Sequence, residues 1–271
     1  METTFKLTIE YCGTPYAGWQ IQPDQPTVQQ TIQEALSRMV TRPVTVIASG
    51  RTDAGVHAVA QVAHFKTKTA IPAEKFQDAL NRMLPPGITI HACQKVADTF
   101  HARFGARRKR YTYRIINRPE APAVAHDTFW HIRNPLDVAA MKKAAAHLVG
   151  THDFKAFEGA GSPRATTVRT VSEACIHDHG QGLVTLTFCG SGFLKFMVRN
   201  LAGTLVDVGL SRTSPEAFKG ILDSCKRKNA GPTAPPQGLF LVRVEYEDVP
   251  HAPRQFTDSP LYPAGLWLGP C

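Results

Sequence analysis

The chain has 271 residues, of which 43% are hydrophobic and 20% charged, a composition typical of a globular protein with a sizeable core. It carries 31 Lys and Arg against 22 Asp and Glu, and the resulting net charge of +9 favours a polyanionic partner. The N-terminus lacks the apolar stretch of a signal peptide, and no apolar run reaches membrane-spanning length. We therefore expect a cytoplasmic protein without a membrane segment.

The first part of the chain predicts a β-α-β-β-α-β order of elements. Alternating apolar and polar residues predict a strand at 5–9, and an apolar stripe predicts a helix over 28–40. Two strands, at 42–49 and 59–66, are expected on either side of a glycine-bearing turn. A helix at 74–84, which ends at two prolines and a glycine, and a strand at 88–96 complete this ferredoxin-like unit.

The second part predicts a similar order. Strands are expected at 109–116, 128–133, 168–177, 183–189 and 238–246, and helices at 137–149 and 193–209. A further helix is expected to begin at Ser214, which is followed by Pro215 and Glu216, because these residue types suit an N-cap and the first turn.

The predicted fold class is therefore α+β, with two ferredoxin-like units whose antiparallel sheets join around a central basic cleft. We expect an N-terminal subdomain over 1–104, a C-terminal subdomain over 105–248, and a tail over 249–271 in which no usable motif is found.

The stretch "SGRTDAGVHA", residues 49–58, contains a single carboxylate, Asp53, between Arg51 and His57. Gly, Asp and Thr are ordinary turn residues, so the stretch could be structural. An Asp presented on a turn beside an Arg is equally suited to nucleophilic or base catalysis. The turn is expected to join two strands, where it could face a cleft.

Arg199 lies in the strongly apolar helix predicted at 193–209. A buried guanidinium without a partner is very costly, so an acceptor should be close. The partner could be a structural carbonyl or Asp207, or it could be Asp53, which Arg199 would then hold ionised and oriented. The residues alone leave these alternatives open.

The segment "RFGARRKRYTYR" combines basic and aromatic side chains. Tyr111 and Tyr113 should lie on one face of a strand, most simply as core residues. Tyr111 directly follows a basic run that includes Arg107, Arg108 and Arg110, and this pattern also suits base stacking beside phosphate contacts. No set of His, Cys, Asp and Glu has the spacing of a catalytic zinc site, so no metal is expected.

Several segments together resemble the TruA family of tRNA pseudouridine synthases. These segments are "GRTDAGVHA", "YCGTPYAGWQIQP", "NRMLPPGI", "FHARFGARRKRYTYRI", "FLKFMVRNLAGTLVDVG" and "GPTAPPQGLFLVRVEY". The resemblance covers about residues 6–246, with the segments in the order of the family.

The resemblance implies isomerisation of uridine to pseudouridine at positions 38, 39 and 40 of the tRNA anticodon stem-loop, without a cofactor, by a homodimer. It implies that Asp53 is the catalytic aspartate and that Arg199 pairs with it. Tyr111 would stack on the target base and assist proton removal at C5, and Arg51 would help to hold the flipped-out nucleotide. Two alternatives stay open: a non-catalytic RNA-binding protein or chaperone on the same fold, and a related synthase acting at other RNA sites.

Overall fold

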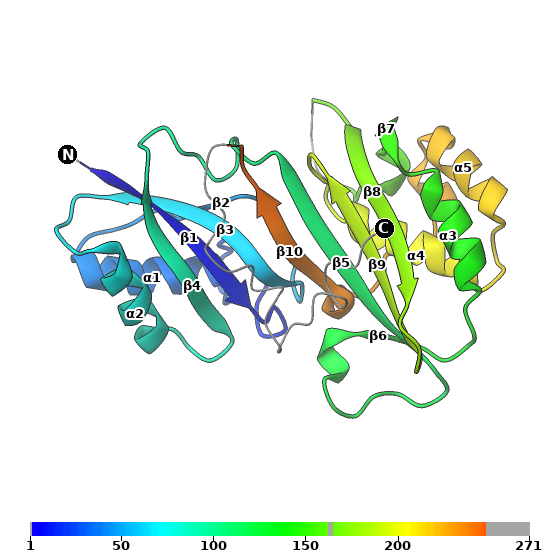
Figure 1. Ribbon diagram of the computed structural model, residues 1–271, viewed down its shortest axis with the longest axis horizontal. Coiled ribbons are helices and arrows are strands. Elements are labelled where there is room, and N and C mark those ends of the chain that lie inside the picture. The colour runs from blue at the N-terminus through cyan, green and yellow to red at the C-terminus, as the bar shows by residue number, and fades with distance from the viewer. Residues whose placement is uncertain (1, 162–164, 248–271) are drawn as a thin grey trace. The chain divides into compact units, whose positions relative to one another are not determined.

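The computed structural model describes residues 2–161 and 165–247, so the expected tail over 249–271 lies outside the described residues. The chain divides into two compact units (Figure 1). Of the described residues, the first unit contains 2–107 and 240–247, and the second contains 108–161 and 165–239. The first unit is thus assembled from two separate stretches of sequence, whereas our predicted division is a single boundary after residue 104.

The first unit contains a sheet in which β1 lies between β4 and β3, and both β2 and β10 pair with β3. The strands are β1 (Thr3–Tyr11), β2 (Ile47–Ala48), β3 (His57–Thr67), β4 (Ile88–Val96) and β10 (Leu239–Glu245). All pairs are antiparallel except β3 with β10, which is parallel. β1 pairs along one edge of β3. β10 and β2 therefore pair with different parts of the other edge. Phe240 of β10 pairs with His57 at the start of β3.

Two amphipathic helices, α1 (Val28–Val40) and α2 (Ala73–Met83), complete the β-α-β-β-α-β order and confirm the prediction for this unit. Thr27 caps α1 by accepting a hydrogen bond from the backbone N–H of Gln30. In the core, the rings of Phe65 of β3 and Phe76 of α2 both lie 5.1 Å from Phe5 of β1.

The prediction of a strand at 42–49 is largely wrong, because only the two residues of β2 pair as a strand. Side chains of α1 take the place of a neighbouring strand. Val46 accepts a 2.8 Å hydrogen bond from the amide of Gln29 and donates one of 2.9 Å to Gln33. The N–H of Val44 donates to the hydroxyl of Ser37 at 3.1 Å. These backbone groups are therefore satisfied without a sheet ladder.

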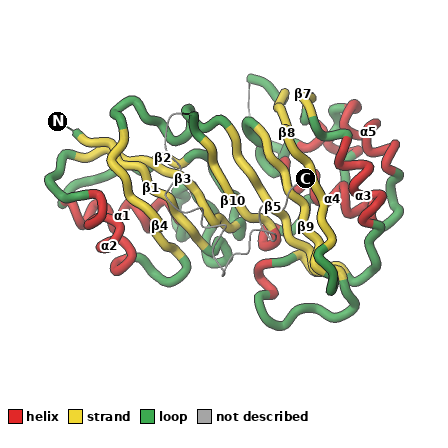
Figure 2. Tube along the Cα trace, viewed as in Figure 1, coloured by secondary structure: helices red, strands yellow, loops and turns green. Residues whose placement is uncertain are grey.

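The second unit has the strand order β5-β9-β8-β7, all antiparallel, with β6 parallel to β5. The strands are β5 (Arg108–Asn117), β6 (Trp130–Ile132), β7 (Gly150–Asp153), β8 (Val168–Asp178) and β9 (Leu183–Gly190). The α-helices are α3 (Val138–Ala146), α4 (Met197–Gly209) and α5 (Pro215–Ser224). Figure 2 shows these strands in yellow and these helices in red. The unit is α+β, as predicted.

Two helix starts test the sequence rules in this unit. The hydroxyl of Ser214 accepts a hydrogen bond from the N–H of Ala217, and Pro215 occupies the first turn, so the predicted start of α5 is confirmed. The helix predicted from residue 193 begins instead at Met197. Phe196 has a φ of +59°, a left-handed conformation that a continuing helix excludes. Sequence hydrophobicity alone does not reveal this bend.

Candidate active site

The turn with Asp53 joins β2 to β3 in the first unit. It closes locally, since the N–H of Val56 donates a 3.1 Å hydrogen bond to the carbonyl of Asp53. Thr52 and Val56 are buried, whereas Arg51 is exposed and Asp53 is half-buried. The turn therefore anchors itself in the core on both sides of a carboxylate that stays accessible.

The loop after β1 holds this turn through its backbone. The N–H of Trp19 donates to the carbonyl of Thr52 at 3.1 Å, and the N–H of Gly55 donates to the carbonyl of Tyr16 at 3.3 Å. Gly18 has a φ of +98°, and a Cβ there would lie 2.7 Å from the carbonyl oxygen of Thr52. The two segments can lie this close only because Gly18 has no side chain.

Buried polar side chains support the turn from the sheet. The hydroxyls of Tyr11 and Thr52 share a 2.8 Å hydrogen bond. Gln61 accepts a 2.7 Å bond from the hydroxyl of Ser49 and donates a 3.0 Å bond to the carbonyl of Gly50. Burial raises the pKa of Tyr11 to about 12, so this hydroxyl stays protonated at neutral pH. The position of Asp53 is thus defined by a network within the unit.

His57, the other titratable residue of the turn, has structural contacts. Its side chain is buried, and its Nδ1 accepts a 3.1 Å hydrogen bond from the N–H of Gly13, which requires an unprotonated Nδ1. Its ring stacks on Phe240 of β10 at 4.5 Å. The strand that returns from the end of the chain therefore packs where the turn enters β3.

In the second unit, Tyr111 and Tyr113 lie on the same face of β5, as predicted. Tyr113 is fully buried and donates a 2.6 Å hydrogen bond to the carbonyl of Pro235. Burial raises the pKa of Tyr113 above its usual value, and the charge of Arg199 acts in the opposite direction. Tyr111 is 8% exposed and packs edge-to-face on Phe193 at 5.2 Å. Tyr113 is a core residue, whereas Tyr111 lies at the margin of the core.

Arg199 lies in α4 and is fixed to the segment after η3 (Arg227–Asn229), a short 3-10 helix. Its Nε donates a 2.8 Å hydrogen bond to the carbonyl of Ala234, whose N–H donates to the carbonyl of Arg199 at 3.1 Å. The guanidinium lies 5.0 Å from the centre of the Phe196 ring, a cation–π distance. One of the alternatives, a structural carbonyl, is therefore present, and it engages one of five guanidinium N–H groups. Asp207 instead pairs with Arg212 at 3.1 Å.

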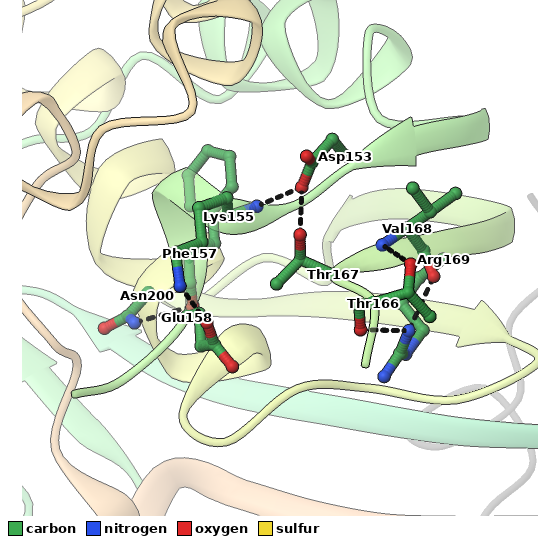
Figure 3. A network of polar contacts seen from close by, with 9 residues as sticks. All are labelled: Asp153, Lys155, Phe157, Glu158, Thr166, Thr167, Val168, Arg169 and Asn200. Atoms are coloured by element: carbon green, nitrogen blue, oxygen red, sulfur yellow. Dashed lines mark hydrogen bonds and ion pairs between the residues drawn. The ribbon is translucent and has the colours of Figure 1, made fainter. Parts of the chain in front are cut away.

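Asn200, the next residue of α4, is fully buried and connects three segments, a role that we did not predict. Its amide donates a 2.8 Å hydrogen bond to the carbonyl of Phe157, as Figure 3 shows. Its side-chain oxygen accepts from Arg227 at 3.1 Å and from the hydroxyl of Thr233 at 2.6 Å. The helix turn that contains Arg199 is therefore locked in place. A lone amide in an apolar helix was the signal that could have revealed it.

The segment that Asn200 contacts, η2 (Lys155–Phe157), is itself fixed to strand β7, which also bonds to the residue just before β8. Asp153 accepts hydrogen bonds from the backbone N–H of Lys155 at 3.0 Å and from the hydroxyl of Thr167 at 2.5 Å (Figure 3). The ammonium of Lys155 pairs with the buried carboxylate of Glu158 at 2.7 Å. This network extends the support of α4 to the far strands of its sheet.

The predicted phosphate-binding arginines differ in their surroundings. Arg107 pairs with Glu247 at 2.5 Å, and both side chains are 63% exposed. Arg110 pairs with Glu173 at 2.7 Å and is more deeply buried. Arg108 is exposed at the start of β5. Side chains alternate along a strand, so Arg108 and Arg110 lie on the opposite face of β5 from Tyr111.

The described residues contain neither a candidate metal site nor a candidate membrane-spanning helix. In that part of the chain, no group of three or more His, Cys, Asp and Glu side chains is arranged to hold a metal ion. No helix in the same residues is long and apolar enough to cross a bilayer.

Comparison with known proteins gives the family of the chain. The family model described as tRNA pseudouridine synthase matches residues 7–105 and 144–247. Proteins named tRNA pseudouridine synthase A are similar over most of their length. The chain is 45% identical to that of Thermoanaerobacter sp. (strain X514) over 240 residues, which cover 89% of this chain and 98% of the relative. It is 44% identical to that of Myxococcus xanthus over 247 residues, 91% of this chain and 93% of the relative. Asp53 and Arg199 lie within the residues that the family model matches, and Tyr111 lies between its two matched segments. The chain belongs to the tRNA pseudouridine synthase family.

Proposed function

We propose that this protein isomerises uridine to pseudouridine at positions 38, 39 and 40 of the tRNA anticodon stem-loop, with Asp53 as the catalytic carboxylate. The family supports the reaction, and the geometry of the Asp53 turn supports the residue. The single observation that carries the proposal is a half-buried carboxylate on a turn whose neighbours, Thr52 and Val56, are buried and hydrogen-bonded. A turn that is fixed in this way holds a reactive group within a narrow range of positions and orientations.

The reaction needs no net electron transfer and no added group. The bond between N1 and C1′ of the uridine breaks, a bond between C5 and C1′ forms, C5 loses its proton and N1 gains one. Product and substrate are isomers, so the chemistry requires no cofactor. Asp53 can attack C1′, attack the base, or remove a proton at C2′, and a carboxylate is competent for each of these steps.

The remaining site residues have complementary proposed roles. Tyr111 stacks on the target base and assists proton removal at C5. Arg199 pairs with Asp53 through the part of its guanidinium that the Nε bond to Ala234 does not use. Arg51, which is exposed beside Asp53, helps to hold the nucleotide that has left its stack. Extruding a base costs a few kcal/mol, which stacking and basic contacts offset.

Arg107, Arg108 and Arg110 are proposed to contact phosphates of the tRNA. The exposed ion pair of Arg107 with Glu247 contributes at most about 1 kcal/mol, so a phosphate can replace the carboxylate at small cost. Arg110 is the more constrained of the three, because its pair with Glu173 is partly buried. We expect Arg107 and Arg108 to account for more of the salt-dependent affinity than Arg110.

The central test compares Asp53→Asn and Asp53→Ala with Asp24→Asn, which alters an exposed carboxylate of the same unit. Release of tritium from C5-labelled uridine in tRNA measures turnover, and filter binding measures affinity. Both Asp53 variants should lose turnover while they retain tRNA binding, and Asp24→Asn should keep both. Near-normal turnover in Asp53→Ala would refute the catalytic role. Wild-type protein that binds tRNA but releases no tritium would favour the non-catalytic alternative.

We also propose that the protein acts as a homodimer, as the family resemblance implies, and that it does so in the cytoplasm, as expected from its sequence. A tRNA is an elongated molecule, too long for one small cleft of a 29.7 kDa chain, which fits a substrate shared between two chains. Sedimentation at micromolar concentration should give a species of twice this mass. A fully active monomer would contradict the proposal.

A further inference from the structure

The loop between β4 and β5 presents an exposed aromatic ring, Phe104, for which neither the fold nor the proposed chemistry has a use. The side chain is 78% exposed. A single exposed apolar residue is not informative by itself, and Val124 is even more exposed at 86%. Two further features distinguish Phe104 from Val124. One is the way its loop is anchored to the core, and the other is the charged side chains near its ring.

The backbone of the loop is fixed to the core of the first unit just before Phe104. The N–H of the fully buried Ala102 donates a 3.1 Å hydrogen bond to Nδ1 of His64 in β3. The carbonyl of Ala102 accepts a 2.7 Å bond from the hydroxyl of Tyr246. The loop then closes on itself, since the N–H of Gly105 donates to the carbonyl of His101 at 2.9 Å. The exposed ring is therefore held by an ordered loop.

The Phe104 ring packs against the ring of His101. The His101 ring lies 4.4 Å from it at an angle of 30°, and Nδ1 of His101 accepts 3.2 Å hydrogen bonds from the N–H groups of both Arg103 and Phe104. The guanidinium of Arg103 lies 5.6 Å from the ring centre. Arg107, three residues further along the chain, is a second exposed cationic side chain and pairs with Glu247.

We propose that Phe104 is an RNA-contacting residue whose ring stacks on a base of the bound tRNA, while Arg103 and Arg107 contact phosphates on either side of that base. An aromatic platform flanked by basic side chains is the arrangement that binds single-stranded or unstacked nucleotides in a sequence-tolerant way. The inference requires only that the chain binds tRNA, and it does not depend on which uridines are modified.

The charges favour RNA over a protein as the occupant. Phe104 has a guanidinium at cation–π distance and lies in a segment with an excess of arginine. An aromatic ring and one guanidinium also occur together in protein interfaces, but a segment with several like charges complements a polyanion. Val124, by contrast, has Glu120 and Asp127 and no Lys or Arg within four residues. It provides a matched control, an exposed apolar side chain without the basic setting.

The test measures tRNA affinity of the full-length protein by filter binding at one fixed salt concentration. Phe104→Ala and Phe104→Leu should both weaken binding about 5- to 100-fold, since loss of one stacked base is worth that much. Phe104→Tyr and Phe104→Trp should stay close to wild type, and Val124→Ala should not change affinity. The side chain is largely exposed, so all variants should unfold at the wild-type urea concentration.

Three results would overturn the inference. Affinity of Phe104→Ala within twofold of wild type would remove any contact with RNA. Full affinity in Phe104→Leu would show an apolar contact without stacking. A change in sedimentation of Phe104→Ala without RNA would indicate that a second protein chain covers the ring. The salt dependence should be the same in wild type and Phe104→Ala, because no charge is removed.

Discussion

Gly18 lies directly against Thr52, so that a side-chain carbon on the glycine would be 2.7 Å from the carbonyl oxygen of the threonine. This contact sits one residue from the proposed catalytic carboxylate. It joins the loop after β1 to the Asp53 turn without any side chain between them, and the adjacent hydrogen bond from Trp19 to Thr52 fixes the same approach.

Gly18→Ala should therefore lower turnover much more than it lowers tRNA affinity. The added methyl group clashes with backbone, which cannot move without displacing Asp53. Gly180→Ala is a matched control, because Gly180 also has a positive φ but no neighbouring atom within 4 Å. Both variants should lose about 1 kcal/mol of stability from backbone strain. Gly18→Ala should lose more because of the clash with Thr52, and only Gly18→Ala should lose catalysis. Equal single-turnover rates in the two folded variants would contradict the role of the close contact.

Arg199→Lys tests whether Arg199 acts on Asp53. Lysine keeps the charge but lacks the planar fork that grips a carboxylate, so single-turnover chemistry should slow by orders of magnitude, with a smaller loss of tRNA binding. The bond from Nε to the carbonyl of Ala234 offers a rival account in which Arg199 only fixes α4. That account predicts lower stability with near-normal turnover of the folded fraction. Rates corrected for the folded fraction, measured by urea titration, distinguish the two.

The salt dependence of tRNA binding tests the basic segment. Arg107→Ala and Arg108→Ala should each reduce the slope of log K against log salt by about one, because each removes one phosphate contact. Arg110→Ala should change the slope less and stability more, since its pair with Glu173 is partly buried. Lys219→Ala, which removes an exposed ion pair with Asp223 on α5, is the control. An unchanged slope in the Arg107, Arg108 and Arg110 triple variant would show that these residues face away from the RNA.

Local patterns predicted the elements whose apolar residues follow a regular period. Period-2 and helical stripes placed β1, β3, β4, α1 and α2 correctly, and the residues at Ser214 and Pro215 predicted the start of α5. The length of β2 was overestimated, because the residues next to it hydrogen-bond to side chains of α1. This is a tertiary effect that a short stretch of sequence does not reveal. The pairing of β10 with β3 brings together residues about 180 positions apart, and no pattern in either strand specifies that partner.

The same distinction applies to the site. The Asp53 turn was recognisable because Gly, Asp and Arg in one stretch constrain both conformation and chemistry. Asn200 was missed, although its buried amide holds α4 to Phe157, Arg227 and Thr233. Its partners come from separate segments, so its importance appears only when the fold brings them to one point. The sequence predicted a backbone carbonyl as one possible partner of Arg199, but it did not identify Ala234 as the residue that provides it.

His64 anchors the loop that contains Phe104, and its protonation should make the stability of the fold depend on pH. His64 accepts the hydrogen bond from Ala102 through Nδ1, which requires a neutral ring. Burial lowers the pKa of His64 from about 6.5 to about 4, and the nearby His101 acts in the same direction. Between these two values the unfolded chain binds more protons than the folded chain. The free energy of unfolding should therefore be largest above about pH 6.5 and fall as the pH drops toward 4.

His64→Asn isolates this contribution, because the Asn side-chain oxygen can accept the same hydrogen bond but does not titrate. Urea unfolding at pH 7 and pH 5 should show a smaller loss of stability in His64→Asn than in wild type. Burial also lowers the pKa of His179, so part of the pH dependence should persist in the variant and should shrink again in His64→Asn combined with His179→Asn. Equal losses in wild type and His64→Asn would show that protonation of His64 is not resisted by the fold.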